Sequence, residues 1–211
     1  MKKPAKTPRA AYTTVESAAQ IRALTSPLRQ DIVDLAQAMV RVSVPELADH
    51  LGRPADALYY HVRALQRAGL LVEAGARRRG RHQETLYSTP DPERRLMLRY
   101  RSGRGAATKP LRTLVASMLR NSRREFDSAI GDPECVVEGP RRELWAGRAT
   151  GWLTQAELAK VNRLIAQLGQ LLSSPHSARR DRLYSLQFLL SPSAPVRKAA
   201  STRAKQPRNQ S

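Results

Sequence analysis

The chain of 211 residues carries 37 Lys and Arg against 18 Asp and Glu, which gives a net charge of +19. Since 41% of its residues are hydrophobic, at least part of the chain is expected to fold. The charge indicates a polyanionic partner, with nucleic acid as the first choice and a membrane surface as the second. An interfacial helix needs Trp, Phe and Leu opposite its cations, and the two Trp and two Phe of this chain argue against the membrane.

Both ends of the chain are rich in Lys, Arg, Pro, Ser and Ala and poor in large apolar side chains. Such segments bury too little surface to offset the entropy of ordering, so residues 1–14 and 192–211 are predicted to be disordered basic tails. Between them we expect two blocks, residues 15–90 and residues 91–191. No apolar run is long enough for a signal peptide or a membrane span, which predicts a cytoplasmic protein.

The first block begins with a helical pattern, because apolar residues recur at spacings near three and four. These residues are Ile21, Leu24, Leu28, Ile32, Val33, Leu35 and Ala36. Ser26 followed by Pro27 matches an N-cap and a first helical position. The stretch is therefore predicted to form two helices that meet at this dipeptide.

A short strand and a short helix follow. Residues 40–44, VRVSV, alternate as in a strand. Ser43 and Glu46 form a capping box for the short helix PELADHL, and Gly52 ends that helix. A longer helix is predicted at residues 54–68, so a short helix, a glycine turn and a longer helix come in immediate succession. This is the order of a helix-turn-helix motif.

The helix at 54–68 has one apolar face, since Leu58, Val62 and Leu65 fall at i, i+4 and i+7. Its outward residues combine small side chains with hydroxyl and guanidinium groups that can bond DNA bases or phosphates. The predicted DNA-binding residues of this helix are Ala55, Asp56, Ala57, Tyr59, Tyr60, Arg63 and Arg67. Taken alone, the same face also fits a solvated surface with one tyrosine packed locally. His61 is interpreted as a packing residue or a phosphate contact.

Beyond Gly69 the pattern changes to short runs typical of strands. Residues 70–75 and 84–89 predict two strands joined by the basic loop ARRRGRHQ at 76–83. A hairpin directly behind a helix-turn-helix is a wing. Guanidinium groups on its loop suit contact with phosphates or the minor groove, and a solvated loop is the alternative. The predicted DNA-binding residues of the wing are Arg77, Arg78, Arg79 and Arg81.

The runs IRALTSPLRQDIVDLA, VPELADHLG, ALYYHVRALQRAGLL and VEAGARRRGRHQETLYS together resemble the ArsR-like winged helix-turn-helix transcription regulators. The resemblance covers about residues 20–90, and its most specific pieces are SPLR and LYYHVRALQRAGLL. Residues at the family's usual helix and strand positions are Leu58, His61, Val62, Leu65, Gly69 and Leu70. The resemblance implies binding of operator DNA as a homodimer.

Two departures from the family pattern matter. Metal-sensing members carry a cysteine pair in the helix before the recognition helix, whereas SVPELADHLG offers no thiolate. Arsenic, cadmium or zinc sensing at that place is therefore not expected. Pro54 stands where a capping Ser or Thr often precedes the recognition helix, and proline starts a helix without capping it through a side chain.

The second block is predicted to be helical with short strands, so the fold class is mainly α with small β elements (α+β). One helix at 111–130 carries an apolar face of Leu111, Leu114, Val115, Met118, Leu119, Phe126 and Ile130. A second helix opens with a capping box of Thr154 and Glu157 and carries Leu158, Val161, Leu164, Ile165, Leu168, Leu171 and Leu172. Residues 142–153 and 182–190 predict short strands.

The segment between the two blocks contains a spacing similar to that of a phosphate-binding loop. Gly103 and Lys109 are spaced as in that loop, but Thr108 replaces its second glycine. Residues 95–102, RLMLRYRS, read as a charged helix and not as the strand that such a loop follows. We interpret 103–109 as a hinge.

The apolar faces of the second block are interpreted as a combined core and dimer interface. An effector pocket for a small apolar molecule is the alternative, with walls formed by Trp145, Trp152, Tyr184 and Phe188. No polar constellation identifies such a ligand.

The sequence therefore predicts a sequence-specific DNA-binding transcription regulator, a homodimer on a pseudo-palindromic operator. The alternative is a non-specific chromosome- or RNA-binding protein driven by the basic tails. An enzyme is not expected, because Cys135, Glu157 and Asp181 show no nucleophile beside a base. One cysteine and four histidines without CxxC or HxxxH spacing predict no disulfide, metal or other cofactor.

Overall fold

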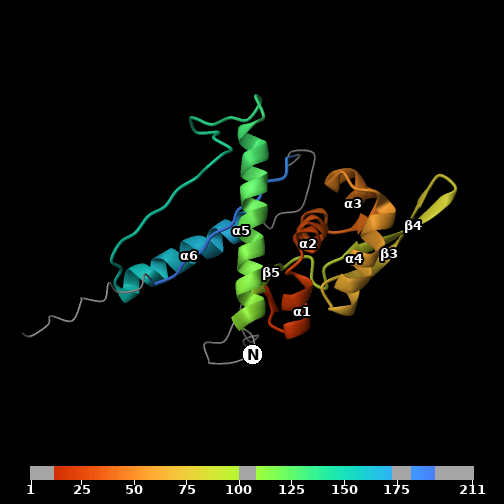
Figure 1. Cartoon of the computed structure of the whole chain (residues 1–211), viewed down its shortest axis with the longest axis horizontal. Helices are drawn as coiled ribbons and strands as arrows, with labels where there is room; N and C mark the ends of the chain where they lie inside the picture. The colour runs from red at the N-terminus through yellow and green to blue at the C-terminus, as the bar shows by residue number, and fades with distance from the viewer. Residues whose placement is uncertain (1–11, 100–107, 173–181, 193–211) are drawn as a thin grey trace, which may run out of the picture.

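The computed structural model describes residues 12–99, 108–172 and 182–192. Its fold is mainly α with small β elements, as predicted, with an N-terminal winged helix-turn-helix and a helical extension. The extension contains α5 (Thr108–Ile130) and α6 (Gln155–Leu172). Figure 1 shows α5 standing between the winged domain on one side and α6 on the other. The predicted tails lie outside the described residues, apart from their innermost positions at 12–14 and 192.

Four helices make up the helical part of the winged domain: α1 (Ala18–Ala23), α2 (Pro27–Met39), α3 (Val44–Leu51) and α4 (Ala55–Arg67). Their apolar faces meet in one core. The largest fully buried side chains of this core include Ile32, Leu47, Leu58, Leu65, Leu70 and Leu71. The predicted spacing of three and four therefore identified the faces that pack.

Local signals set the ends of these helices. The hydroxyl of Ser43 accepts from the Glu46 N–H, the Glu46 carboxylate accepts from the Ser43 N–H, and Gly52 ends α3 with a left-handed φ of 58°. The capping box and the glycine stop are thereby confirmed. Ser26 does hold the N-cap position of α2, but its side chain makes no capping bond. Pro54 at the N-cap of α4 makes none either, as expected.

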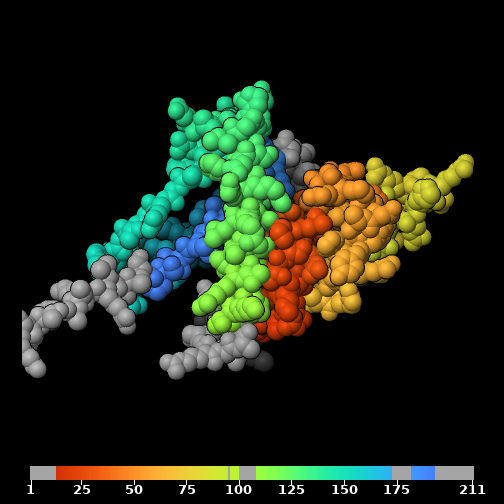
Figure 2. All heavy atoms as spheres, in the orientation of Figure 1, coloured from red at the N-terminus to blue at the C-terminus, as the bar shows by residue number. Residues whose placement is uncertain are grey.

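The wing is longer than predicted. A three-stranded antiparallel sheet has the order β2-β4-β3, formed by β2 (Val42–Ser43), β3 (Val72–Arg79) and β4 (His82–Ser88). The basic loop predicted at 76–83 is wrong, because Gly80 and Arg81 alone separate the strands. Gly80 has a φ of 61°, which suits a tight hairpin turn. Figure 2 shows the hairpin projecting from the body of the molecule.

A second, two-stranded sheet was not predicted. The strand β1 (Tyr12–Val15) pairs in parallel with β5 (Arg95–Leu98). The charged helix expected at 95–102 is therefore wrong at its start, and residues 12–14 belong to a strand and not to the tail. The reason is packing: Val15 is buried, and Leu96 and Leu98, which alternate in β5, lie against the core.

Helix α5 packs against α1 and α2 through a narrow stripe. The buried residues of α5 are Leu114, Ser117 and Asn121. Of the apolar face predicted for this helix, only Leu114 is buried, and Leu119 and Ile130 are half or more exposed. Residues 103–107 of the predicted hinge lie outside the described residues. Its last two residues, 108 and 109, begin α5.

The strands predicted at 142–153 and 182–190 are wrong, since both segments are irregular. The backbone before the first segment closes a turn on itself, with the Glu143 N–H donating to the Val136 carbonyl at 2.7 Å. No neighbouring strand supplies a ladder to either segment in the described part of the chain. The Thr154 and Glu157 capping box of α6 is confirmed.

Candidate nucleic-acid interface

Helix α4 is held by one face and presents the opposite face to solvent. Leu58, Val62 and Leu65 are at most 1% exposed and fix the helix on the core. Asp56 and Tyr60 begin a row of exposed side chains on the other side. Since side chains three and four positions apart share a helix face, this row is continuous along the helix. Its members are Asp56, Tyr60, Arg63 and Arg67.

The two tyrosines of α4 point in different directions. Tyr60 is 63% exposed and lies in the outward row, whereas Tyr59 is 41% exposed and lines a groove beside the wing. Ala57 is exposed and Ala55 is half-buried, so both leave the start of α4 open to close approach. The predicted α4 residues therefore lie together at one surface, with Tyr59 on its flank.

His61 is a packing residue. It is half-buried, and its ring meets that of Tyr60 edge-on with centroids 5.4 Å apart. Its Nδ1 atom is buried and makes no hydrogen bond within the described structure. Burial, helped by the nearby charge of Arg29, lowers the pKa of His61 below its ordinary value of 6.5. Burial therefore disfavours the charged imidazolium of His61.

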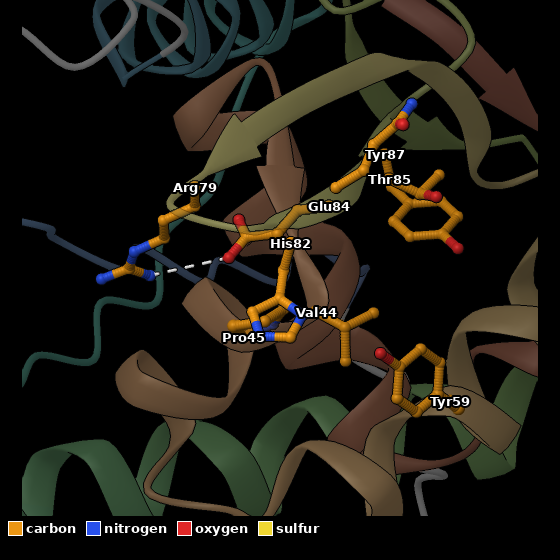
Figure 3. Close-up of a pocket in the computed structure, with 9 residues that line it drawn as sticks. Val44, Pro45, Tyr59, Arg79, His82, Glu84, Thr85 and Tyr87 are labelled. Carbon is orange, nitrogen blue, oxygen red and sulfur yellow. Dashed lines mark ion pairs between the residues drawn. The ribbon is translucent and has the colours of Figure 1, made fainter.

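A groove of about 620 Å³ separates α4 from the wing. Its walls come from the start of α3, from Tyr59 of α4, from Arg79 at the end of β3 and from the strand β4. The lining residues are Val44, Pro45, Tyr59, Arg79, His82, Gln83, Glu84, Thr85 and Tyr87. Figure 3 shows the His82 ring beside Pro45 and Val44. Hydroxyl, amide and cationic groups thus face a groove that continues the surface of α4.

The four wing arginines are not equivalent. Arg77 pairs with two carboxylates, since its Nη2 lies 2.9 Å from Glu46 and 3.1 Å from Glu84. Arg79 lies 3.8 Å from Glu84, and the dashed line in Figure 3 marks this ion pair. Arg78 donates only to the Gly80 carbonyl among the hydrogen bonds described.

Arg81 at the turn is exposed and makes no ion pair within the described part of the chain. Together with Arg78 it supplies charge at the end of the hairpin that no neighbouring carboxylate offsets. We predicted that all four arginines leave their charge free at the wing tip. Within the described structure only Arg78 and Arg81 do so, because Arg77 pairs with two carboxylates and Arg79 lies near one of them.

Sequence reasoning missed the two carboxylates that hold Arg77. Hydrogen bonding from Arg77 is the main cause that lowers the pKa of Glu84 below 4.5. For Glu46, burial acts to raise the pKa, but hydrogen bonds from Ser43 and Arg77 outweigh it and leave the pKa lowered. Both side chains are thus ionised at neutral pH. Register in the hairpin could have indicated Glu84, since it sits opposite Arg77.

The aromatic pocket predicted in the second block is not formed within one chain. Trp145 is 74% exposed, and Trp152 is as exposed as in an extended peptide. Tyr184 and Phe188 remain 47% and 42% exposed. The Tyr184 hydroxyl donates to Glu143 at 2.6 Å, and Trp145 stacks under the Arg142 guanidinium at 4.5 Å. The four rings therefore do not enclose a shared cavity.

No group of three or more His, Cys, Asp or Glu side chains that could hold a metal ion occurs in the described residues. Cys135 is a half-buried free thiol. Asp181, the last of the reactive side chains considered above, lies outside the described residues.

Residues 12–99 have a winged helix-turn-helix fold, and this fold with the exposed face of α4 supports DNA binding. Comparison with protein families supports this, because the model of a helix-turn-helix domain family matches residues 24–74. That range runs from the end of α1 to the start of β3 and supports DNA binding and transcription regulation. A search of curated proteins finds no match. Among the described helices, none has the length and apolar character that a membrane crossing requires.

Proposed function

We propose that the protein is a sequence-specific transcription regulator that places α4 in the major groove of operator DNA. The observation that carries the proposal is the row of Asp56, Tyr60, Arg63 and Arg67 on the face of α4 opposite its buried leucines. A recognition helix contacts base edges mainly through its N-terminal half. The small side chains of Ala55 and Ala57 in that half allow the helix backbone to approach the bases.

The proposed contacts divide by chemistry. Asp56 and Tyr60 lie near the start of the helix and bond base edges, with Tyr59 reaching from the flank. Arg63 and Arg67 lie farther along the same face and neutralise phosphates. The wing adds phosphate or minor-groove contacts through the arginines at its end. Each arginine that neutralises a phosphate releases a counterion and so favours binding.

The distal helices support the homodimer. No residue of the 18-residue helix α6 is buried. Leu164, Leu168 and Leu171, at spacings of four and three, are 46–67% exposed. Most of the stability of a helix in a protein comes from packing of its apolar face, and burying each leucine is worth roughly 1.5–3 kcal/mol. A second copy provides a self-complementary apolar face and places two α4 helices on the two halves of a pseudo-palindrome.

The resemblance to ArsR-like regulators supports the same arrangement over residues 20–90. The aromatic residues Trp145, Trp152, Tyr184 and Phe188 belong to the exposed surface of one chain, so in the proposed dimer the second copy would supply the missing walls of an effector pocket among them. The absence of thiolates from α3 leaves the metal-sensing mode of the family without ligands there.

The test measures fluorescence anisotropy of a duplex from the protein's own promoter region and of a scrambled duplex, across a salt series. The proposal expects tighter binding of the native fragment at moderate salt. Equal and steeply salt-dependent binding of both duplexes would reject it in favour of the non-specific basic protein, which the net charge of +19 makes the alternative.

A further inference from the structure

Arg77 joins three elements of the winged domain. It lies on β3, and its Nη2 atom is 3.1 Å from Oε2 of Glu84 on the paired strand β4. The same nitrogen is 2.9 Å from Oε1 of Glu46 on α3. That nitrogen therefore donates a hydrogen bond to Glu84 and forms an ion pair with Glu46. The guanidinium links the hairpin to the helix that precedes the recognition helix.

The carboxylate of Glu46 is a fixed anchor. While Oε1 pairs with Arg77, Oε2 accepts from the Ser43 N–H at 2.9 Å as part of the capping box. Both oxygens are engaged, so the side chain is held in one orientation at the start of α3. The Glu84 side chain is only 11% exposed, which restricts its movement as well. Arg77 thus meets two partners whose positions are already determined.

The outer part of the wing needs such a link. The strand β2 pairs only with Leu86 and Tyr87, so the hairpin beyond them is a two-stranded ribbon. A register shift between Glu73 and Ala76 interrupts the ladder just before Arg77. Two-stranded ribbons are marginally stable in water, and a bulge adds a bend. The angle of the ribbon is therefore poorly determined by the sheet alone.

We propose that Arg77 is a positioning residue that sets the wing against the recognition helix, and that the wing's phosphate contacts come from Arg78 and Arg81. The inference rests on the proposed DNA-binding function. Arg77 pairs with both Glu46 and Glu84, and Arg79 with Glu84 at 3.8 Å, so the charges of these four side chains sum to zero. Arg78 and Arg81 have no carboxylate partner in the described part of the chain. Binding of the wing to DNA then depends on Arg77 through geometry and not through its charge.

The experiment compares wild type, Arg77→Ala, Arg81→Ala and Glu84→Gln by anisotropy on the promoter duplex across a salt series. A residue that neutralises a phosphate contributes about 0.9 to the slope of log affinity against log salt. Arg77→Ala is expected to weaken binding about three- to tenfold, because the wing must be ordered on binding, with the slope unchanged. Arg81→Ala, the matched loss of one guanidinium, lowers the slope by about 0.9.

Glu84→Gln separates position from charge. Removing a negative charge near DNA strengthens binding if charge alone matters. Positioning predicts the opposite, a weaker complex, because Arg77 loses one of its two anchors. This variant also decides the question if Arg77→Ala fails to fold, since it keeps the size and shape of the side chain.

The outcomes are distinguishable from failure of the proposed function. Wild-type protein that does not prefer its promoter duplex contradicts that function, and the role of Arg77 with it. Promoter-specific wild type with a reduced slope in Arg77→Ala makes Arg77 a phosphate contact and overturns the inference alone. Unchanged affinity in Arg77→Ala, or tighter binding by Glu84→Gln, overturns it equally.

Discussion

The side-chain amide of Asn121 in α5 donates to Oδ1 of Asp31 in α2 over 3.0 Å. The same amide nitrogen lies 3.3 Å from the side-chain Oε1 of Gln30, and Arg124 pairs with the other oxygen of Asp31 at 2.9 Å. Asn121 and Gln30 are 5% and 8% exposed. A buried polar contact therefore joins α5 to the winged domain, in addition to the apolar contacts of Leu114 and Met118 with the core.

Asn121→Ala is expected to lower the free energy of unfolding by about 1–3 kcal/mol, because buried oxygens of the winged domain lose their donor. Chemical denaturation of the full chain measures this value. Arg123→Ala is the matched control on the same helix, since its side chain is 83% exposed and pairs only with Asp127 among the ion pairs described. The control should change stability by less than about 0.5 kcal/mol. Equal effects of the two variants would contradict the role assigned to Asn121.

Local signals in the sequence predicted the helix-turn-helix. The capping box of Ser43 and Glu46, the left-handed Gly52 and the stripe of Leu58 each depend on neighbours within a few positions. Such features can be found without knowing the tertiary structure. The placement of α4, and hence of its outward row, followed from them.

Features that depend on distant partners were missed. The strand β5 exists because β1 lies beside it, and its sequence RLML alone fits a helix equally well. The two carboxylates that hold Arg77 become neighbours only when the hairpin closes on α3. A run of arginines in the sequence therefore indicated a uniformly charged tip, while the folded wing divides those residues between internal pairing and exposure.

Loss of specific contacts from α4 should weaken promoter binding. Tyr60→Ala and Arg63→Ala each remove an exposed polar group from the outward row, and a base or phosphate contact is worth roughly 1–3 kcal/mol. We expect affinity for the promoter duplex to fall about 5- to 100-fold. Arg63→Ala also reduces the salt slope if it meets a phosphate, whereas Tyr60→Ala leaves it unchanged.

Arg148→Ala is the charge-matched control for Arg63→Ala, because it removes the same charge from an exposed, irregular segment outside the winged domain. Its promoter affinity should stay close to that of wild type. A comparable loss in this control would mean that total charge, and not the face of α4, determines binding. Anisotropy titrations of the four proteins at one moderate salt concentration decide between the two.

The dimer proposal predicts that a charge in the apolar row of α6 dissociates the protein. Leu168→Lys places an ammonium group between Leu164 and Leu171 in the apolar row. In the dimer the second copy would bury this charge without a partner. Light scattering after size exclusion should give twice the chain mass for wild type and the single-chain mass for the variant.

Gln170→Lys serves as the control for the dimer, since it adds the same charge to α6 at an exposed position outside the leucine row. It should retain the mass of wild type. Wild type that already elutes with the single-chain mass at micromolar concentration would contradict the homodimer. Promoter affinity measured in parallel should fall with dissociation, because two half-sites are then no longer bound by one assembly.

The ion pairs of the wing should give part of the stability a dependence on pH. Hydrogen bonding from Arg77 holds the pKa of Glu84 below the ordinary value of 4.5. The folded state therefore binds this proton less readily than the unfolded state does. The contribution is complete above the ordinary pKa and is lost as pH falls through the lowered value. Glu84→Gln, which cannot ionise, lacks that contribution at every pH.

Thermal unfolding of wild type and Glu84→Gln from neutral to acid pH tests this sign. The midpoint of wild type should exceed that of the variant at neutral pH, and the difference should close below the ordinary pKa of 4.5. High salt should reduce the difference as well, because the Arg77 side chain is 43% exposed and its pairs are partly screened. Glu138→Gln is the control, at an exposed position without an ion pair in the described structure. The difference between its unfolding midpoint and that of wild type should not change as pH falls. A difference that grows toward acid pH would mean that Glu84 is not stabilised as an anion by Arg77.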